Sequence, residues 1–360
     1  MDKSRMKAIA GHFALDGKVK DVESLGNGLI NDTYLVSCEG PDVRYVLQRV
    51  NTEIFRDPVL LQANIKAVTE HIANVLRCNG VPDIERRVLS CIDTIEGLPY
   101  YDDGGGVWRM TRYIADSRTI SDMTPELARI TGCAFGEFHA MLAMDDAPQL
   151  GESIPNFHNL PFRLKQLRDA VAADSCGRLA SVRDIVDELL ARADEMTLAE
   201  RLFAAGELPR RICHCDTKID NILFGKDGNV LCVIDLDTTM PGFVMSDFGD
   251  FIRTAGNKGK EDDTDLEAVE VDMDIFKAFA EGYISQARFL TDVERKTLPY
   301  GAQRMVYMQT VRFLSDYLNG DTYYKIAYPE HNIVRTRAQY KLLQSLDANL
   351  DNMNKVISEI

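Results

Sequence analysis

The sequence predicts an α+β protein of two lobes, in which a small antiparallel β-sheet precedes a mainly helical lobe. The chain has 360 residues, and at about 150 residues per domain this length allows two sizeable cores. Up to about residue 115, short alternating runs and glycine turns surround one main helical pattern. After Ile114, long helical patterns dominate. We therefore expect an N-terminal lobe at 1–115 and a helical C-terminal lobe at 116–360.

The first lobe begins with a helical pattern at residues 3–15, whose apolar positions repeat on one face. Two β-like runs, at 19–40 and 43–51, follow, and the glycines within and between them predict antiparallel hairpins. An amphipathic helix is expected at 58–78, because Asp57 and Pro58 form a typical helix start. Further strand-like pieces are found at 85–92, 97–103 and 106–114.

The second lobe opens with a strong helical pattern at 125–144, again with proline at its start. Helical patterns also predict helices at 161–173, 181–205, 265–288, 292–318 and 335–357. One strand-rich segment at 211–238 interrupts them, and it contains the residues that most clearly predict chemistry.

Composition excludes several classes of protein. The 41 Lys and Arg against 56 Asp and Glu give a net charge of −15, which argues against binding of nucleic acid. No run approaches the roughly 18–20 apolar residues that a membrane span needs. The N-terminal segment has a charge-broken pattern without a small-residue cleavage site, so we expect no signal peptide and a cytoplasmic protein.

Eight scattered cysteines are expected to be buried thiols in a reducing compartment. The run Cys213-His214-Cys215 superficially suggests a metal site. On a strand, however, successive side chains point to opposite faces, and no second Cys/His pair stands at a zinc-like spacing. We therefore predict core residues here and no metal.

The motif His214-x-Asp216-x-x-x-x-Asn221, followed by an apolar strand that ends at Asp235, predicts phosphoryl transfer to a hydroxyl. In that chemistry one carboxylate orients the acceptor and takes its proton, while an Asn and a second Asp hold Mg²⁺ on the nucleotide phosphates. Asp216 is the predicted base, and Asn221 and Asp235 are the predicted metal ligands. Lys218, two residues after the base, can reach the transferring phosphoryl group.

A second match to a kinase motif, Asp247-Phe248-Gly249, lies too far downstream to end the strand after the catalytic hairpin. We predict that Asp247 is instead a buried carboxylate that holds the backbone amides of a loop. For His214 we expect a structural role that braces the same loop.

The first lobe offers candidates for binding nucleotide. Gly26-Asn27-Gly28 lets backbone approach a phosphate closely, although a plain hairpin is the commoner explanation of Gly-x-Gly in a turn. Asn31 and Thr33 follow on the next run. The segment 108–114 ends the last strand of the lobe, where a kinase hinge would offer backbone groups to adenine. Its candidates are Arg112 and Ile114.

With these motifs the chain resembles the aminoglycoside-phosphotransferase/choline-kinase superfamily, and within it the bacterial N-acetylhexosamine 1-kinases. The resemblance spans residues 26–339 and is carried by GNGLINDTYLV, RYVLQRVNTEIF, HCDTKIDNILF, VIDLDTTMPGFVMSDFGDFIR, RFLSDYLNGDTYY and YPEHNIVRTRAQ. It implies a two-lobed protein-kinase-like fold and ATP-dependent phosphorylation of the anomeric hydroxyl of a hexose or N-acetylhexosamine. Asp216 would be the base, and Arg312 and Tyr323 would contact the sugar. From the residues alone, Arg312 could equally be a surface cation and Tyr323 a packed aromatic.

The chain departs from the hexosamine kinases at two positions near the acceptor, where Leu29 replaces an expected His and Thr254 an expected Phe. At the position where kinases of this fold usually have a lysine on their third strand, this chain has Gln48, and the hexosamine kinases resemble it there. Which side chain steadies the nucleotide phosphates is therefore an open question. The exact sugar is therefore open too. The alternatives are a kinase for an aminoglycoside, choline or another hydroxyl compound, and a catalytically dead nucleotide-binding protein.

Overall fold

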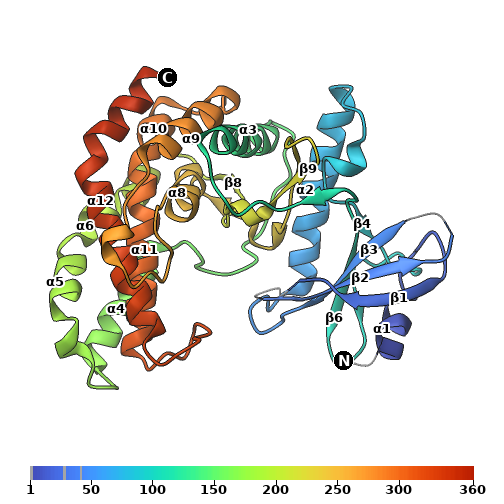
Figure 1. Cartoon of the computed structure of the whole chain (residues 1–360), viewed down its shortest axis with the longest axis horizontal. Helices are drawn as coiled ribbons and strands as arrows, with labels where there is room; N and C mark the ends of the chain where they lie inside the picture. The colour runs from blue at the N-terminus through green and yellow to red at the C-terminus, as the bar shows by residue number, and fades with distance from the viewer. Residues whose placement is uncertain (1–2, 27–29, 41–42) are drawn as a thin grey trace. The chain divides into compact units, whose positions relative to one another are not determined.

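The computed structural model describes residues 3–26, 30–40 and 43–360. It confirms the predicted fold class, an antiparallel sheet in the N-terminal region followed by a helical C-terminal part (Figure 1). The chain forms two compact units, each built from three segments. The first unit contains residues 1–119, 144–155 and 221–240, and the second contains 120–143, 156–220 and 241–360.

The main sheet of the first unit is antiparallel throughout, in the order β1-β2-β3-β6-β4, with β5 paired to β6. Its strands are β1 (Val19–Ser24), β2 (Asp32–Cys38), β3 (Arg44–Val50), β4 (Cys91–Ile92), β5 (Tyr101–Asp102) and β6 (Val107–Arg112). The helices are α1 (Lys3–Ala10) and α2 (Pro58–Cys78). The Asp57 side chain accepts a hydrogen bond from the Leu60 amide, which explains why α2 begins where the sequence predicts.

The core of this sheet forms where the apolar face of α1 packs with the inward residues of the strands. The buried residues of this cluster are Met6, Ile9, Ala10, Phe13, Val22, Val36, Tyr45, Leu47, Trp108 and Met110. The first four belong to the predicted helical stretch 3–15, although the helix itself ends at Ala10.

A second, three-stranded sheet of the first unit has the order β10-β9-β7 and consists of β7 (Ser117–Arg118), β9 (Ile222–Gly225) and β10 (Val230–Val233). Most of the strand-rich segment that the sequence predicts inside the helical lobe thus forms the β9–β10 hairpin. Its first strand, β8 (Arg211–Cys213), pairs instead with β11 (Met240–Gly242).

The second unit is mainly helical. Figure 1 shows α11 lying along α12 and α8, and α3 packs against α9. Its helices are α3 (Pro125–Leu142), α4 (Leu160–Ala173), α5 (Arg183–Ala191), α6 (Ala193–Met196), α7 (Leu198–Ala204), α8 (Val244–Ala255), α9 (Met273–Gln286), α10 (Asp292–Lys296), α11 (Leu298–Leu318) and α12 (His331–Glu359). Among the helices of the described residues, none is long and apolar enough to cross a membrane.

Three predicted helices are interrupted. The stretch 181–205 forms α5, α6 and α7, and the hydroxyl of Thr197 donates to the carbonyls of Ala193 and Asp194 at the second break. The stretch 292–318 divides into α10 and α11 at Thr297, shortly before Pro299. In 265–288, the regular helix α9 begins only at Met273.

The strand expected at 85–92 was predicted too long. A 3-10 turn covers Ile84–Arg86 after Asp83, whose φ of 53° places it in the left-handed region, and only Cys91–Ile92 pair as β4. The alternation of apolar and polar residues there reflects a turn packed on the protein surface.

Candidate active site

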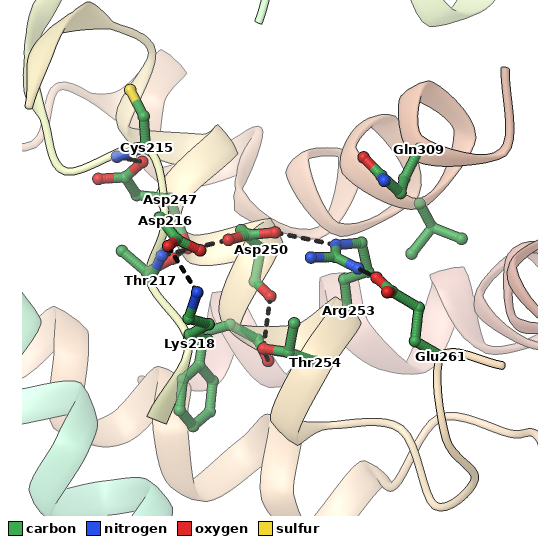
Figure 2. A network of polar contacts seen from close by, with 12 residues as sticks. Cys215, Asp216, Thr217, Lys218, Asp247, Asp250, Arg253, Thr254, Glu261 and Gln309 are labelled. Atoms are coloured by element: carbon green, nitrogen blue, oxygen red, sulfur yellow. Dashed lines mark hydrogen bonds and ion pairs between the residues drawn. The ribbon is translucent and has the colours of Figure 1, made fainter. Parts of the chain in front are cut away.

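The buried carboxylate of Asp247 holds the loop after β8 through hydrogen bonds to two of its backbone amides. The backbone N–H of His214 donates to Asp247 Oδ2 over 2.6 Å, and that of Cys215 donates to Oδ1 over 2.9 Å (Figure 2). Cys215 has a φ of 63°, so these bonds stabilise a left-handed backbone that a non-glycine residue seldom adopts. The prediction that Asp247 holds loop amides is confirmed.

Asp247 also closes a buried chain of hydrogen bonds. Its Oδ2 lies 2.9 Å from His139 Nε2, and His139 Nδ1 lies 2.9 Å from the hydroxyl of Tyr283. The motif Asp247-Phe248-Gly249 lies within helix α8 and does not end a strand. This carboxylate is therefore part of the scaffold under the loop.

Cys213 lies beside these groups, and its sulfur, an oxygen of Asp247 and a nitrogen of His139 are within 4.8 Å of one another. Burial raises the pKa of the Cys213 thiol well above its usual value, and the charge of Asp247 raises it further. Both ring nitrogens of His139 are already hydrogen-bonded. Because a metal would need a thiolate and a free imidazole lone pair, this cluster is suited to packing.

Asp216 and Lys218 lie on the part of the loop that Asp247 supports. Lys218 Nζ is 2.8 Å from Asp216 Oδ2, and the two side chains are 31% and 26% exposed. Between them, the Thr217 amide donates to Asp250 Oδ2 and its hydroxyl donates to the Asp247 carbonyl. The backbone on both sides of Asp216 is therefore fixed, while its partly exposed carboxylate pairs with Lys218 (Figure 2).

Asp250 and Arg253, one turn apart on α8, extend this network. Arg253 Nε donates to Asp250 Oδ1 over 2.9 Å, and Arg253 Nη1 pairs with Glu261. Burial raises the pKa of Asp250, the neighbouring charge of Asp216 raises it further, and Arg253 opposes both effects. Asp216 thus has a buried acidic neighbour whose charge is balanced by an arginine.

In the first unit, the β9–β10 hairpin brings Asn221 and Asp235 to one end. Ile222 pairs with Val233, and the Ile234 amide donates to the Asn221 carbonyl over 2.9 Å. Asp235 follows directly, with φ of 60° and ψ of 57°, and the chain then turns into the 3-10 segment Leu236–Thr238. An amide oxygen and a carboxylate at one hairpin end are the hard donors that Mg²⁺ favours.

The turn after Asp235 is anchored by Asp237, whose side chain is buried. Asp237 Oδ2 accepts a hydrogen bond of 2.7 Å from Asn31 Nδ2, and Oδ1 lies 2.5 Å from Arg109 Nη1. Burial by itself lowers the pKa of Arg109, but attraction to Asp237 and their hydrogen bond outweigh it, and the pKa is raised. Asn31 Oδ1 accepts from the Asn51 amide, so this side chain links β2, β3 and the turn.

Gln48, at the position of the usual kinase lysine, forms hydrogen bonds with both ends of its side-chain amide. Its Oε1 accepts from Arg109 Nε over 2.9 Å, and its Nε2 donates to Thr33 Oγ1 over 3.2 Å. The only cation that contacts Gln48 among the described residues is therefore Arg109, which strand β6 supplies and Asp237 balances. Sequence reasoning assigned Gln48 but missed Arg109.

The other nucleotide candidates differ in what the structure shows. Gly26 has a φ of 70°, whereas Asn27 and Gly28 lie outside the described residues. Arg112 donates its amide to the Ser90 carbonyl, and its guanidinium pairs with Asp16 over 2.8 Å. Ile114 is buried, and its carbonyl accepts from the Ser117 hydroxyl. Their contact with a nucleotide remains a prediction.

The residues expected near the acceptor belong to the second unit, except for Leu29, which lies outside the described residues. Arg312 donates to Gln309 Oε1 over 3.0 Å and stacks on the ring of Tyr324. Tyr323 is 63% exposed, and its amide donates to Asp316. The hydroxyl of Thr254 donates to the Asp250 carbonyl, so it bonds within α8.

Residues 21–290 match the family described as the phosphotransferase enzyme family. This match covers well over half of the chain. The chain belongs to the phosphotransferase enzyme family.

Solved structures that are similar to this family member have the same fold. An aminoglycoside phosphotransferase from Alicyclobacillus acidocaldarius has a TM-score of 0.63 at 15% identity, covering 98% of this chain and 96% of that one. A spectinomycin phosphotransferase in complex with ADP and spectinomycin has a TM-score of 0.59 at 13% identity, covering 98% and 99%. A choline kinase from Cryptosporidium parvum has a TM-score of 0.59 at 14% identity, covering 94% and 92%. The expected kinase-like fold is confirmed.

Sequence reasoning about this phosphotransferase missed the charged residues that support the predicted ones. Asp237 stands two positions after Asp235, and Arg109 interrupts the apolar strand between Trp108 and Met110. A charge inside an apolar strand needs a buried partner, which was the available signal. Asp250 carried a similar signal, because it follows Asp247 at helical spacing.

The buried Arg109–Asp237 pair gives a stability prediction. We expect Arg109→Gln to lower the free energy of unfolding of the phosphotransferase by about 3–5 kcal/mol, since it leaves a buried carboxylate without its cation. Denaturant unfolding measures this loss. The matched control is Arg5→Gln, which breaks an exposed ion pair with Asp103 in the same unit and should change stability little. Equal, small effects of both variants would contradict the assigned role of Arg109.

Proposed function

We propose that this phosphotransferase is an ATP-dependent kinase that phosphorylates the anomeric hydroxyl of a hexose or N-acetylhexosamine. The observation that carries the proposal is the loop at Asp216, where a partly exposed carboxylate pairs with Lys218 on a backbone held at both sides. The resemblance to the N-acetylhexosamine 1-kinases over residues 26–339 supports the choice of acceptor.

In the proposed reaction Asp216 accepts the proton of the acceptor hydroxyl and orients its oxygen toward the γ-phosphoryl group. Lys218 shares its charge between Asp216 and the phosphoryl oxygens. Asp250 lies close enough for its charge to be felt at Asp216, and Arg253 balances that charge. The Asp216 carboxylate that would take the proton is also paired with Lys218.

Nucleotide binding is assigned to the first unit. Asn221 and Asp235 are suited to hold Mg²⁺, which would neutralise phosphate charge as the phosphoryl group transfers. The network of Asn31, Asp237 and Arg109 orders the turn that follows Asp235. Candidates for nucleotide contacts are Gly26, Asn27, Gly28, Asn31, Thr33, Gln48, Arg112 and Ile114.

The second candidate is a kinase for a cationic acceptor, such as choline or an aminoglycoside. The net charge of −15 and the folds of a choline kinase and of aminoglycoside phosphotransferases favour it. The arginine at the proposed acceptor site, Arg312, opposes it, because a cation would be repelled there.

Turnover of ATP with Mg²⁺ and a panel of hexoses, N-acetylhexosamines, choline and aminoglycosides separates these candidates. We expect a sugar to be the preferred acceptor, with its product identified as a sugar 1-phosphate by phosphorus NMR. A product phosphorylated at another position, or turnover of choline or an aminoglycoside alone, contradicts the proposal.

The role of Asp216 predicts a selective loss of turnover. Asp216→Asn should lower kcat at least about 10²-fold, the usual scale of general-base catalysis, and change ATP affinity little. Asp220→Asn is the matched control, because Asp220 is exposed in the same segment. Steady-state kinetics and a direct measurement of ATP binding check this. A folded Asp216→Asn protein with the wild-type kcat refutes the assignment.

The two candidate metal carboxylates should behave differently. Asp235→Ala is expected to abolish Mg²⁺-supported turnover and weaken nucleotide binding with Mg²⁺ present, while leaving the thermal transition near that of the wild type. Asp247→Ala should chiefly lower the melting temperature, since two amides and His139 lose their acceptor. If Asp247→Ala instead removed metal dependence in a folded protein, the metal would belong to Asp247.

A further inference from the structure

Two arginines of the second unit, Arg163 of α4 and Arg312 of α11, meet at Phe157. Arg163 Nη2 donates to the Phe157 carbonyl over 3.1 Å, and the Arg312 guanidinium lies 5.3 Å from the centre of the Phe157 ring. Their other polar contacts are neutral, since Arg163 Nη1 bonds to Gln166 and Arg312 Nη1 to Gln309. Within the described part of the chain, neither arginine forms an ion pair.

The neighbouring arginines are paired with acids. Arg304 Nη2 lies 2.7 Å from Glu200 Oε1, and Arg253 pairs with Asp250 and Glu261. The fold thus provides carboxylates for two cations of this region and leaves the other two, Arg163 and Arg312, without one. In a chain with a net charge of −15, a pair of uncompensated guanidiniums needs an explanation.

The uncompensated charge is also poorly hydrated. Arg163 is 7% exposed, and the Nε atoms of Arg163 and Arg312 and Nδ1 of His158 are buried without a hydrogen-bond partner. Burial and, to a smaller extent, the charge of Arg312 lower the pKa of Arg163 to about 10. Holding two such cations together costs free energy that a bound anion would offset.

A series of charge interactions connects the arginine pair with the proposed base, Asp216. Burial, followed by the charges of Arg312, Arg304, Arg163 and Arg253, holds the pKa of His158 well below its usual value. Arg253 in turn pairs with Asp250, which interacts with Asp216. Figure 2 shows Gln309, the partner of Arg312, in the same view as Asp216 and Arg253.

We propose that the acceptor sugar carries an anionic group, a carboxylate or a phosphate, that Arg163 and Arg312 bind together. This inference rests on the proposed function and narrows its substrate class. An oxyanion accepts hydrogen bonds from both guanidiniums and balances their charge, whereas a neutral hydroxyl or acetyl carbonyl only accepts hydrogen bonds. The aromatic rings of Phe157 and Tyr324 contact the planar Arg312 guanidinium and restrict its orientation.

The test measures kcat/KM of the full-length protein with ATP and Mg²⁺ for matched sugars. The neutral arm is glucose and N-acetylglucosamine, the carboxylate arm glucuronic acid, and the phosphate arm glucose 6-phosphate and N-acetylglucosamine 6-phosphate. We expect at least one anionic sugar to exceed its neutral parent by about 10-fold or more, as charged hydrogen bonds allow. The better arm identifies the anion.

Variants then assign the preference to the arginine pair. Arg163→Gln and Arg312→Gln should each raise KM for the anionic sugar about 10-fold or more, while KM for ATP changes little. Arg312→Lys, which keeps the charge, should retain part of the preference. Arg168→Gln, on the exposed face of the same helix α4, is the matched control and should change neither constant.

Three outcomes overturn the inference: neutral sugars that are phosphorylated as well as anionic ones, an anionic preference that both folded variants retain, or equal effects of Arg168→Gln. If neutral sugars alone are phosphorylated at the anomeric position, the inference fails and the proposed function stands. If no sugar is phosphorylated while choline or an aminoglycoside is, both fail.

Discussion

The rest of the candidate site depends on the hydrogen bonds that the buried carboxylate of Asp247 accepts from the loop after β8. The two carboxylate oxygens accept from consecutive amides, at His214 and Cys215, in a backbone conformation that Cys215 adopts at a cost of about 1–3 kcal/mol. Charged hydrogen bonds of this kind each contribute about 1.5–3 kcal/mol, enough to hold the strained turn. The position of Asp216, the next residue, follows from that turn.

In both units, buried charged side chains have polar or oppositely charged partners inside the protein. Asp247 is balanced by amides and His139, Asp250 by Arg253, and Asp237 by Arg109 and Asn31. Two of these carboxylates lie beside a residue proposed for chemistry. Asp237 follows Asp235 by two positions, and Asp250 accepts from the amide of Thr217, the residue after Asp216. Several buried charges are thus balanced inside the protein, whereas Arg163 and Arg312, which meet at Phe157, form no ion pair with the described residues. This makes them candidate positions for a ligand.

Much of the fold was predictable from local patterns. The start of α2 at Pro58 follows from its cap, and the spacing of Asp216, Asn221 and Asp235 predicted a loop and hairpin that the structure contains. The breaks at Thr197 and Thr297 were missed, because each depends on a threonine hydroxyl that bonds to carbonyls of the preceding turn. Helical periodicity continues through such breaks.

The supporting charges were harder to predict, because their partners are distant in sequence. Arg109 and Asp237 are brought together by the fold, and a single sequence contains no signal that pairs them. Asp247 was predicted correctly only because its motif lay in the wrong place for a metal ligand. Membership of the phosphotransferase family agrees with the resemblance, while a sugar as acceptor stays a proposal.

Hydrogen exchange at the amides of His214 and Cys215 tests most directly whether Asp247 holds the loop. Both amides should be strongly protected in the wild type. In Asp247→Asn, the side-chain amide has one acceptor oxygen for two donors, so at least one of the two should exchange 10-fold faster or more, about the effect of one lost charged hydrogen bond. The amides of α11 serve as the reference for global stability, and the faster exchange at His214 or Cys215 is measured relative to them. Equal exchange at both positions in the two proteins would contradict the account.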